Sequence, residues 1–231
     1  MRLNIQIELE NNKLPKDYRR GFMSLIKSAF EAGDDFFYRQ LYDQKTDKPF
    51  TFSVYFPELK GEEDGFIHVG NNALLNVSSN EPVLMTHLYN GTRKITTHQW
   101  QDYNSFKIKS YKAFFNKEIK KEHCLFKTVA PFLVNKEGDN LRYLTPEDYD
   151  FDKGFRHNIQ ELARKFLNKD NVELEYSIHR HKKMVVSHYN QSMTCNKGII
   201  EMHTEPEILN LLNNIGIGVR RSQGFGMVET I

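Results

Sequence analysis

The apolar positions at the start of the chain follow two different spacings. Residues 3–9 carry apolar side chains at every second position, which predicts a half-buried strand. Residues 18–30 carry them at helical spacing, which predicts a helix that begins near Pro15 and ends at Gly33. A second, short helix is expected over residues 34–42, where aromatic residues and leucine recur. The chain is therefore predicted to open with a strand followed by two helices.

The pattern that follows completes a recognisable order of elements. A polar loop over 43–48 leads into an aromatic and β-branched run at 50–56, which predicts a strand. Residues 65–70 are expected to be its hairpin partner. A helix is expected over 81–89 and a fourth strand over 94–103. The predicted order is strand, helix, strand, strand, helix, strand, which is the order of a ferredoxin-like domain.

The second half of the chain repeats this order. Its predicted elements are a strand over 124–134 interrupted by Pro131, a helix opening at 144–148 and running to 166, hairpin strands over 172–178 and 192–203, a helix over 205–213 and a strand over 225–229. Together the halves predict an α+β fold of two tandem ferredoxin-like (RRM-like) βαββαβ domains. Their expected bounds are 1–103 and 123–231. The alternation over 104–122 is poor, so this connecting segment fits either extra strands or a linker.

Composition and charge restrict where basic character can act. Of the 231 residues, 39% are hydrophobic and 13% aromatic, which is enough for a buried core, and the formal net charge is only +2. Attraction to a polyanion must therefore come from local clusters. No apolar run reaches membrane-spanning length, the strand pattern follows directly on Met1, and Cys124 and Cys195 have no metal-ligand spacing. We expect a cytoplasmic protein without a signal peptide or a membrane partner.

The most informative motif is a glycine-rich basic loop over residues 214–230, between a predicted helix and a predicted strand. Glycine admits positive φ and lets a ligand approach backbone N–H groups, and arginine offers a forked donor suited to phosphate. The loop therefore predicts contact with a polyanion. The residues expected to contribute are Gly216, Gly218, Arg220, Arg221, Ser222, Gln223, Gly224 and Gly226. The alternative is that Gly216 caps the helix and an ordinary turn follows.

The ending G-I-G-x-x-x-S-Q-G-F-G-M-V, in a chain of two ferredoxin-like units, resembles the CRISPR repeat-RNA-processing endoribonucleases, the Cas-six family of the RAMP superfamily. Residues 29–56, 126–134 and 143–165 resemble further parts of the family, so the similarity spans most of the chain. The resemblance implies binding of CRISPR repeat RNA and metal-independent endonuclease cleavage that leaves a cyclic phosphate. It also implies a part in antiviral defense with effector-complex proteins as partners, and it allows a homodimer.

Metal-free RNA cleavage uses the 2′-hydroxyl as nucleophile, so it needs a base, an acid and a cation near the phosphate. The resemblance implies a histidine at the end of the first helical region, with a lysine downstream and a tyrosine nearby. Residues 34–50 contain no histidine. The matching positions are Tyr42 and Lys48, with Tyr38 assisting, and these three are the candidate catalytic residues. The alternative for the two tyrosines is aromatic packing under the first helix.

A run of basic or titratable residues stands out in the second half: His179, Arg180, His181, Lys182 and Lys183. It caps a predicted strand and is expected to bind RNA, because the family holds the RNA stem with its second domain. The alternative is a solvated hairpin tip. His179 and His181 have an i, i+2 spacing that a metal could use, yet no further ligands lie nearby in the sequence. We therefore expect no metal and no cofactor.

Two functions remain open from the sequence. The chain is either a metal-independent endoribonuclease or a family member that binds repeat RNA as an effector-complex subunit without cutting it. Loss of one acid–base group slows catalysis by roughly 10²- to 10⁴-fold, so the missing histidine favours slow or absent cleavage. A third class, an unrelated ferredoxin-like domain with a nucleotide ligand, is disfavoured by the glycine-rich loop and the duplicated domain.

Overall fold

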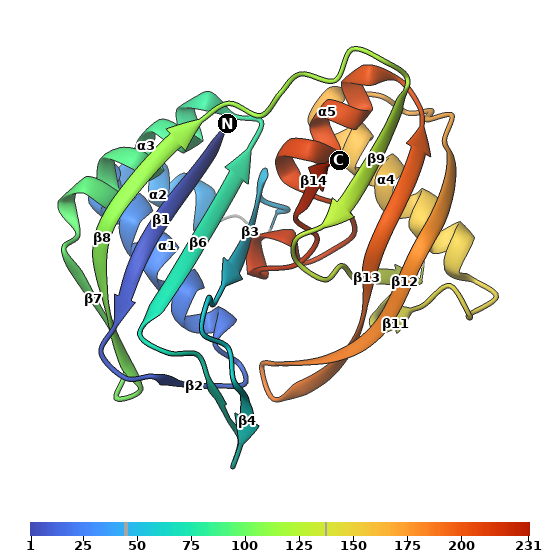
Figure 1. Cartoon of the computed structure of the whole chain (residues 1–231). Coiled ribbons are helices and arrows are strands. Elements are labelled where there is room, and N and C mark those ends of the chain that lie inside the picture. The colour runs from blue at the N-terminus through green and yellow to red at the C-terminus, as the bar shows by residue number, and fades with distance from the viewer. Residues whose placement is uncertain (44–45, 137) are drawn as a thin grey trace. The chain divides into compact units, whose positions relative to one another are not determined.

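The computed structural model describes residues 1–43, 46–136 and 138–231. These residues form two compact units, each with a β-sheet and helices (Figure 1). Unit 1 comprises Met1–Lys48, Ser53–Phe115 and Ser187–Gln191, and unit 2 comprises Pro49–Phe52, Asn116–Val186 and Ser192–Ile231. Among the described residues, no helix is both long and apolar enough to cross a membrane.

Unit 1 is built on a sheet with the strand order β3-β6-β1-β8-β7. The strands are β1 (Arg2–Leu9), β3 (Phe50–Tyr55), β6 (Asn72–Ser79), β7 (Thr97–Trp100) and β8 (Asn104–Phe114). β1 is antiparallel to both neighbours, so Ile5 lies opposite Leu75 on β6 and Tyr111 on β8. Four of these strands, β1, β3, β6 and β8, occupy the four strand positions of a ferredoxin-like domain. Their order in the sheet is the ferredoxin-like one.

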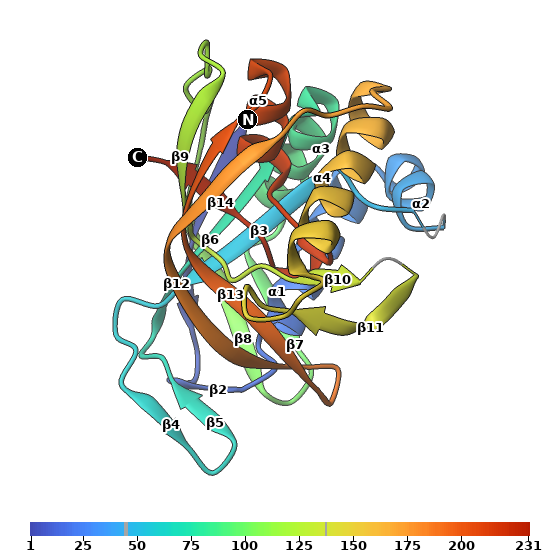
Figure 2. The same cartoon turned by 90° about the vertical axis from the view of Figure 1, so that its right-hand side faces the viewer.

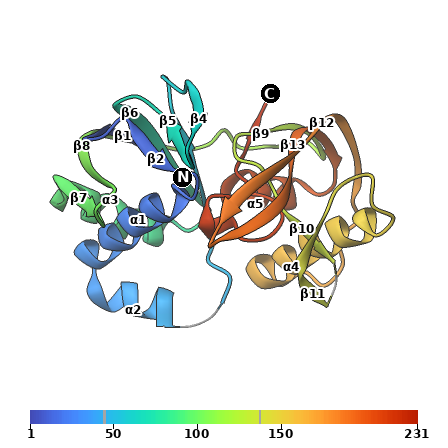
Figure 3. The same cartoon turned by 90° about the horizontal axis from the view of Figure 1, so that it is seen from below.

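The helices of unit 1 are α1 (Arg19–Gly33), α2 (Asp35–Asp43) and α3 (Pro82–Lys94). α1 buries its apolar face against the sheet, and its Phe22 ring stacks on Phe106 of β8 with centroids 4.8 Å apart. Asp34 separates α1 from α2: its backbone is extended, and its Oδ1 accepts the N–H of Phe37 at 2.9 Å. This side-chain cap satisfies a free donor at the start of α2, so the chain turns and begins a second helix (Figure 3).

Two predictions for unit 1 are wrong in detail. The helix begins at Arg19 and not at Pro15, which instead ends the short strand β2 (Lys13–Pro15). Residues 65–70 do not pair with β3: β5 (Phe66–His68) joins β2 and β4 (Gly61–Glu63) in a small sheet of three strands. The missed partner is β6, whose apolar side chains alternate into the core at Ala73, Leu75 and Val77.

The last strand of unit 1 also differs from the prediction. The expected strand over 94–103 is the short edge strand β7, whereas β8 forms from residues that the sequence left unassigned. The pairing of β8 with β1 shifts register between Gln6 and Ile7, as in a β-bulge. A bulge breaks the period of two that identifies a strand, which explains the poor alternation in this segment.

Unit 2 repeats the ferredoxin-like order on a sheet arranged β12-β13-β9-β14. Its elements are β9 (His123–Thr128), β10 (Val134–Lys136), β11 (Asp139–Leu144), α4 (Phe151–Leu167), β12 (Glu175–His188), β13 (Gln191–His203), α5 (Pro206–Ile215), a 3₁₀ turn (Arg221–Gln223) and β14 (Val228–Thr230). The main core lies between the sheet and the two helices and includes Phe126, Phe155, Ile200 and Leu212. β10 and β11 form a separate ribbon next to α4 (Figure 2). The tandem ferredoxin-like fold is confirmed.

The start of unit 2 departs from the prediction at two turns. The strand expected over 124–134 ends at Thr128, and the chain bends before β10. The helix expected from residue 144 begins only at Phe151. Asp148 explains the delay, because its Oδ2 accepts hydrogen bonds from both the N–H (2.8 Å) and the hydroxyl (3.1 Å) of Thr145. These bonds close a turn that competes with helix formation.

In the long hairpin of unit 2, the basic run 179–183 lies neither at a strand end nor at the hairpin tip, the two positions expected from the sequence. β12 continues to His188, and the turn at Tyr189 and Asn190 has positive φ at both residues, 50° and 59°. Two central residues of this kind form the tight turn that suits a twisted hairpin. Residues 179–183 therefore lie in the middle of a strand, and neither at its end nor at the hairpin tip.

Candidate nucleic-acid interface

The three residues expected to act in catalysis lie together in unit 1. Tyr38 and Tyr42 are four residues apart on α2, so they share one side of the helix, and their ring centroids are 5.0 Å apart. Lys48 places its Nζ 4.8 Å from the centroid of the Tyr42 ring. Lys27, on α1, approaches the same ring, with its Nζ 5.1 Å from the centroid. We call these four residues the tyrosine–lysine cluster.

Burial shifts the pKa of two members of the cluster. The pKa of Tyr42 is raised, chiefly because burial disfavours the phenolate and secondarily because Tyr38 lies close. The pKa of Lys48 is lowered, chiefly by burial and then by the charge of Lys27, while Asp47 acts in the opposite direction. Tyr42 therefore keeps its hydroxyl proton at neutral pH. Lys48 gives up a proton more readily than an ordinary lysine.

Lys27 was not among the sequence candidates, although the sequence carries a signal for it. Arg20, Ser24 and Lys27 recur at i, i+4 and i+7, which is one face of a helix. All three are partly exposed on α1, and all three line a pocket. Such a polar stripe is ordinarily a solvated helix face, and the structure shows that this one borders the tyrosine–lysine cluster.

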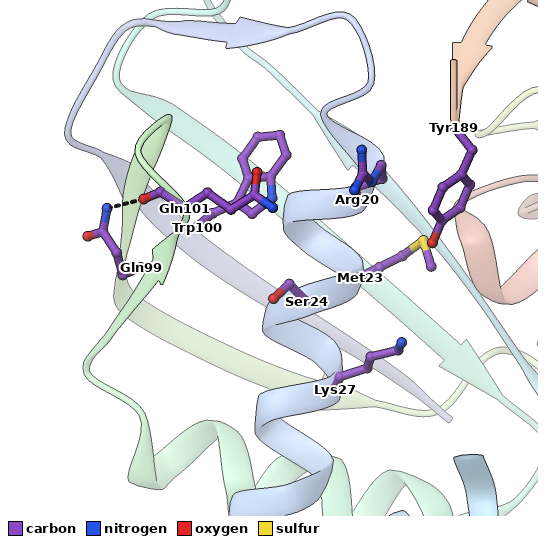
Figure 4. Close-up of a pocket in the computed structure, with 8 residues that line it drawn as sticks. All are labelled: Arg20, Met23, Ser24, Lys27, Gln99, Trp100, Gln101 and Tyr189. Atoms are coloured by element: carbon purple, nitrogen blue, oxygen red, sulfur yellow. Dashed lines mark hydrogen bonds between the residues drawn. The ribbon is translucent and has the colours of Figure 1, made fainter. Parts of the chain in front are cut away.

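The pocket has a volume of about 330 Å³ and combines cationic, amide and aromatic side chains (Figure 4). Its lining residues, all in unit 1, are Arg20, Met23, Ser24, Lys27, Gln99, Trp100, Gln101 and Tyr189. Lys27 belongs to both the pocket and the tyrosine–lysine cluster, so the two are adjacent. None of these eight side chains is acidic, which suits a phosphate, and the aromatic and amide groups suit a base.

Tyr189 is held in the pocket wall by a buried contact. His188, which is buried, places its Nδ1 2.7 Å from Oδ1 of Asp17, and the backbone N–H of Tyr189 donates to Oδ2 of the same carboxylate at 2.9 Å. The guanidinium of Arg20 lies 5.0 Å from the centroid of the Tyr189 ring. The tyrosine and the arginine therefore present a pre-positioned aromatic and cationic surface to the pocket.

A histidine that the sequence did not connect with catalysis also lies beside the pocket. His98, on β7, places its Nε2 3.1 Å from Oγ of Ser24. Burial lowers the pKa of His98, so its ring is neutral at neutral pH. Its place in the sequence, far from residues 34–50, carried no signal of this position.

The glycine-rich loop of unit 2 is built by close backbone packing. Gly216 caps α5 and donates its N–H to the carbonyl oxygen of Leu212 at 2.8 Å, as the helix-cap alternative predicts. The N–H of Ile217 donates to the oxygen of Gly226 at 2.9 Å, and the N–H of Gly226 donates to the oxygen of Pro131 at 2.8 Å. These three N–H groups are engaged within the protein, so they do not form the phosphate cradle that the motif suggested.

Two of the loop glycines are required by their surroundings. Gly226 has a φ of +74°, and a Cβ there would lie 2.0 Å from the carbonyl oxygen of Ile217. Gly218 has a φ of +71°, and its Cβ would lie 2.2 Å from the carbonyl oxygen of Leu133. Real side chains do not approach backbone this closely, and the left-handed φ is itself unfavourable for them. The motif thus records how tightly the backbone is packed.

The two arginines of the loop have different environments. Arg221 is only 4% exposed and donates from Nη1 to the carbonyl oxygen of Ile215 at 3.0 Å. Arg220 is partly exposed; it donates from Nε to the hydroxyl of Tyr143 and from Nη1 to Oε1 of Gln223 at 3.2 Å. Of the other predicted loop residues, Ser222 and Gln223 are partly exposed and Gly224 is buried with a φ of +88°. Arg220, and not Arg221, is therefore placed to reach a ligand.

The basic run of β12 is exposed along its whole length. His179 contacts the carboxylate of Glu201, and Nε2 of His181 lies 2.9 Å from Oδ1 of Asn196. Lys183 pairs with an acidic side chain at 3.5 Å. The run and the glycine-rich loop are both in unit 2, whereas the tyrosine–lysine cluster and the pocket are in unit 1.

Comparisons with known proteins agree with this architecture. A family model described as "CRISPR associated protein Cas6, C-terminal" matches residues 114–230. No curated protein sequence matches the chain. A solved structure described as "Characterization of a Cas6-related gene from Pyrococcus furiosus" has a TM-score of 0.84 at 21% identity, with 100% of this chain and 98% of the other covered.

Two further solved structures are similar over their whole length. One, described as "An RAMP protein binding different RNA substrates", has a TM-score of 0.82 at 21% identity and covers 100% of this chain and 99% of its own. Another, described as "CRISPR associated protein Cas6", has a TM-score of 0.79 at 18% identity and covers 100% of this chain and 99% of its own. At such identities the likeness establishes the fold.

Proposed function

The chain belongs to the Cas6 family of CRISPR-associated proteins, and on this premise we propose that it binds CRISPR repeat RNA and cleaves it within the repeat. The observation that carries the proposal is the tyrosine–lysine cluster beside the pocket of unit 1. Two lysines and two tyrosines meet there, and one lysine has a lowered pKa. The cluster offers the base, the acid and the positive charge that cleavage through the 2′-hydroxyl needs.

In the proposed reaction the 2′-oxygen attacks the adjacent phosphorus, and the bond from phosphorus to the 5′-oxygen breaks. The products are a cyclic phosphate and a 5′-hydroxyl. Lys48, as the neutral amine, accepts the proton of the 2′-hydroxyl. Lys27, as an ammonium ion, stabilises the charge on the phosphorane oxygens and gives its proton to the departing 5′-oxygen. Tyr42 and Tyr38 donate hydrogen bonds that orient the ribose and the phosphate.

The pocket is the proposed seat of a nucleotide next to the cut. Tyr189 offers a ring surface for a base, Gln99 and Gln101 offer amide donors and acceptors, and Arg20 offers a phosphate contact. The exposed run on β12 and Arg220 add phosphate contacts in unit 2. A solved relative of the same fold is described as a RAMP protein that binds different RNA substrates, which supports RNA as the ligand class.

A second candidate function is binding of repeat RNA without cleavage, as a subunit of an effector complex. The observation that favours it is the tyrosine at the position where the family resemblance implies a histidine. Because the pKa of Tyr42 is raised, even less of its hydroxyl is deprotonated at neutral pH than in an unperturbed tyrosine, so it is less available as a base. Under this alternative the tyrosine–lysine cluster binds the phosphate but does not catalyse cleavage of the RNA.

The experiment that tests the proposal uses the repeat RNA of the protein's own locus in the presence of a chelator. We expect one discrete cut, a cyclic phosphate on the 5′ fragment and no reaction when the 2′-hydroxyl at the cut is replaced by hydrogen. Lys48→Ala and Lys27→Ala should each slow the cut, whereas Lys60→Ala is the matched control, because Lys60 is an exposed lysine outside the cluster.

The possible results separate the two functions. Cleavage that depends on Lys48 and Lys27 supports the endoribonuclease. Binding of the repeat without any cut supports the non-cleaving subunit, and a cut that depends on His98 and on neither lysine would move the acid–base role to that histidine. Failure to bind any repeat RNA contradicts both functions.

A further inference from the structure

Four titratable side chains from three strands of unit 2 meet on the sheet face opposite its core. His123 of β9 and His203 of β13 are directly opposite one another in the strand register. Glu201 lies two residues before His203 and so on the same face, and His179 joins from β12. The alternate residues of these strands, Cys124, Ile200 and Met202, belong to the core.

Three of these side chains converge on one point. Nε2 of His123 lies 2.7 Å from Oε1 of Glu201, and Nε2 of His203 lies 3.6 Å from the same oxygen. One ligand atom from each of the three residues lies within 4.8 Å of the others. A tetrahedral ion with bonds of about 2.0–2.2 Å holds its ligand atoms roughly 3.4 Å apart, so the observed spacing requires only small rotations.

His179 fixes the carboxylate from its other side. Its Nε2 contacts Oε2 of Glu201, which leaves Oε1 directed toward His123 and His203. A partner that orients a ligand in this way is typical of metal sites.

The composition of this cluster indicates a metal ion more than an RNA contact. A site for phosphate gathers lysine and arginine side chains, whereas here the three converging groups are two imidazoles and one carboxylate. That donor set matches zinc-class divalent ions, and magnesium prefers oxygen ligands. The side chains of His123 and His203 are 41% and 52% exposed, so an ion can enter from solvent.

We propose that His123, Glu201 and His203 form a binding site for a zinc-class divalent transition-metal ion, with His179 as a positioning residue. Three protein ligands leave a fourth position open to water or to a phosphate oxygen. The ion would link β9 to β13 and add positive charge to this sheet face. Metal binding here is independent of the cleavage chemistry proposed for the tyrosine–lysine cluster.

The test uses the full chain, without any polyhistidine tag, stripped with a chelator and then titrated with Zn²⁺. We expect one ion per chain by calorimetry, no comparable signal with Mg²⁺, and a thermal unfolding midpoint that rises with Zn²⁺. With Co²⁺, the visible absorption should have the intensity of a four-coordinate ion. Glu201→Gln, His123→Gln and His203→Gln should each weaken Zn²⁺ binding by tenfold or more, and His179→Gln by about tenfold.

The matched control is His181→Gln, because His181 is an exposed histidine two residues along β12 that contacts Asn196 and not the cluster. This variant should bind Zn²⁺ as the natural protein does. Zn²⁺ affinity that is unchanged in both Glu201→Gln and His203→Gln, with the fold intact by circular dichroism, would overturn the proposal. So would a loss in His181→Gln equal to the loss in the ligand variants.

Discussion

The tyrosine–lysine cluster of unit 1 and the glycine-rich loop of unit 2 are built in opposite ways. The cluster comes from an unremarkable stretch of sequence, yet its functional groups are half-buried side chains that face one another. The loop carries the strongest motif in the chain, yet the described N–H groups of Gly216 and Gly226 bind other backbone atoms and Arg221 is buried. A conspicuous motif can therefore reflect backbone packing, while the proposed catalytic residues carry no motif.

The largest expected effect tests the chemical side of this comparison. Lys48→Ala should slow repeat-RNA cleavage by roughly 10²- to 10⁴-fold, because it removes the proposed base. RNA affinity should change far less, since Lys48 is one cation among several. Single-turnover cleavage and equilibrium binding measure the two quantities separately. A variant that cuts at the natural rate would remove Lys48 from the mechanism.

The pH dependence of the cut gives the next test. The pKa of Lys48 is lowered. At pH values below that pKa, the fraction of Lys48 present as the neutral amine should increase about tenfold for each pH unit, and the cleavage rate should increase with it. The rise should level off at a lower pH than an ordinary lysine would give. Single-turnover rates between about pH 6 and pH 9 measure the profile. Lys48→Arg should abolish this rise, because arginine stays protonated throughout.

The packing side of the comparison predicts a large loss of stability. Gly226→Ala should lower the free energy of unfolding by at least about 2 kcal/mol, because the left-handed φ and the clash with Ile217 act together. Gly65→Ala is the control: its φ of +82° is similar, but a Cβ there meets no atom within 4 Å. Denaturant unfolding of both variants isolates the clash. Equal losses would contradict the role assigned to close backbone packing.

A smaller loss is expected for the buried arginine. Arg221→Ala should lower the free energy of unfolding by about 1–3 kcal/mol, because it leaves the carbonyl of Ile215 without its donor. Any loss of RNA affinity in this variant should follow the loss of folded protein. Chemical denaturation together with binding at a temperature where the variant is folded would decide this. Weakened RNA binding by a fully folded variant would indicate that Arg221 contacts RNA.

The smallest expected effect belongs to the exposed arginine. Arg220→Ala should leave stability nearly unchanged and weaken RNA binding about two- to tenfold, with the slope of log affinity against log salt reduced by about one. Affinity measured over a series of salt concentrations gives both values. An unchanged affinity and slope would assign the whole loop to packing.

The fold could be predicted further than the site. The ferredoxin-like order followed from hydrophobic spacing, but β6 and β8 were missed. β8 lacks a clean period of two because its register with β1 shifts beside Ile7. The start of α4 was displaced by the side chain of Asp148, which bonds to Thr145. Both errors come from interactions between particular atoms that hydrophobic spacing does not encode.

For the candidate sites, contacts between elements that are distant in the sequence could not be predicted. Tyr38 and Tyr42 were named through the family resemblance, and their four-residue spacing on one helix explains why their rings meet. Lys27 reaches them from another helix, and the polar stripe that contains it gave no indication of this contact. The same holds for the proposed metal site, in which His123 and Glu201 come from different strands and are distant in the sequence. The spacing of His179 and His181 instead suggested a pair, whereas the two side chains contact different partners, Glu201 and Asn196.

The contact of Asp17 with His188 and Tyr189 bears on how the protein can be divided. Those two residues at the hairpin tip belong to unit 1, although the strands that carry them belong mostly to unit 2. A fragment ending at Phe115 would lack the tip, which leaves Asp17 without its partners and the pocket without its Tyr189 wall. The first ferredoxin-like unit therefore cannot be obtained complete by truncating the chain at a single position. Swapping halves between relatives should carry the tip residues with the first half.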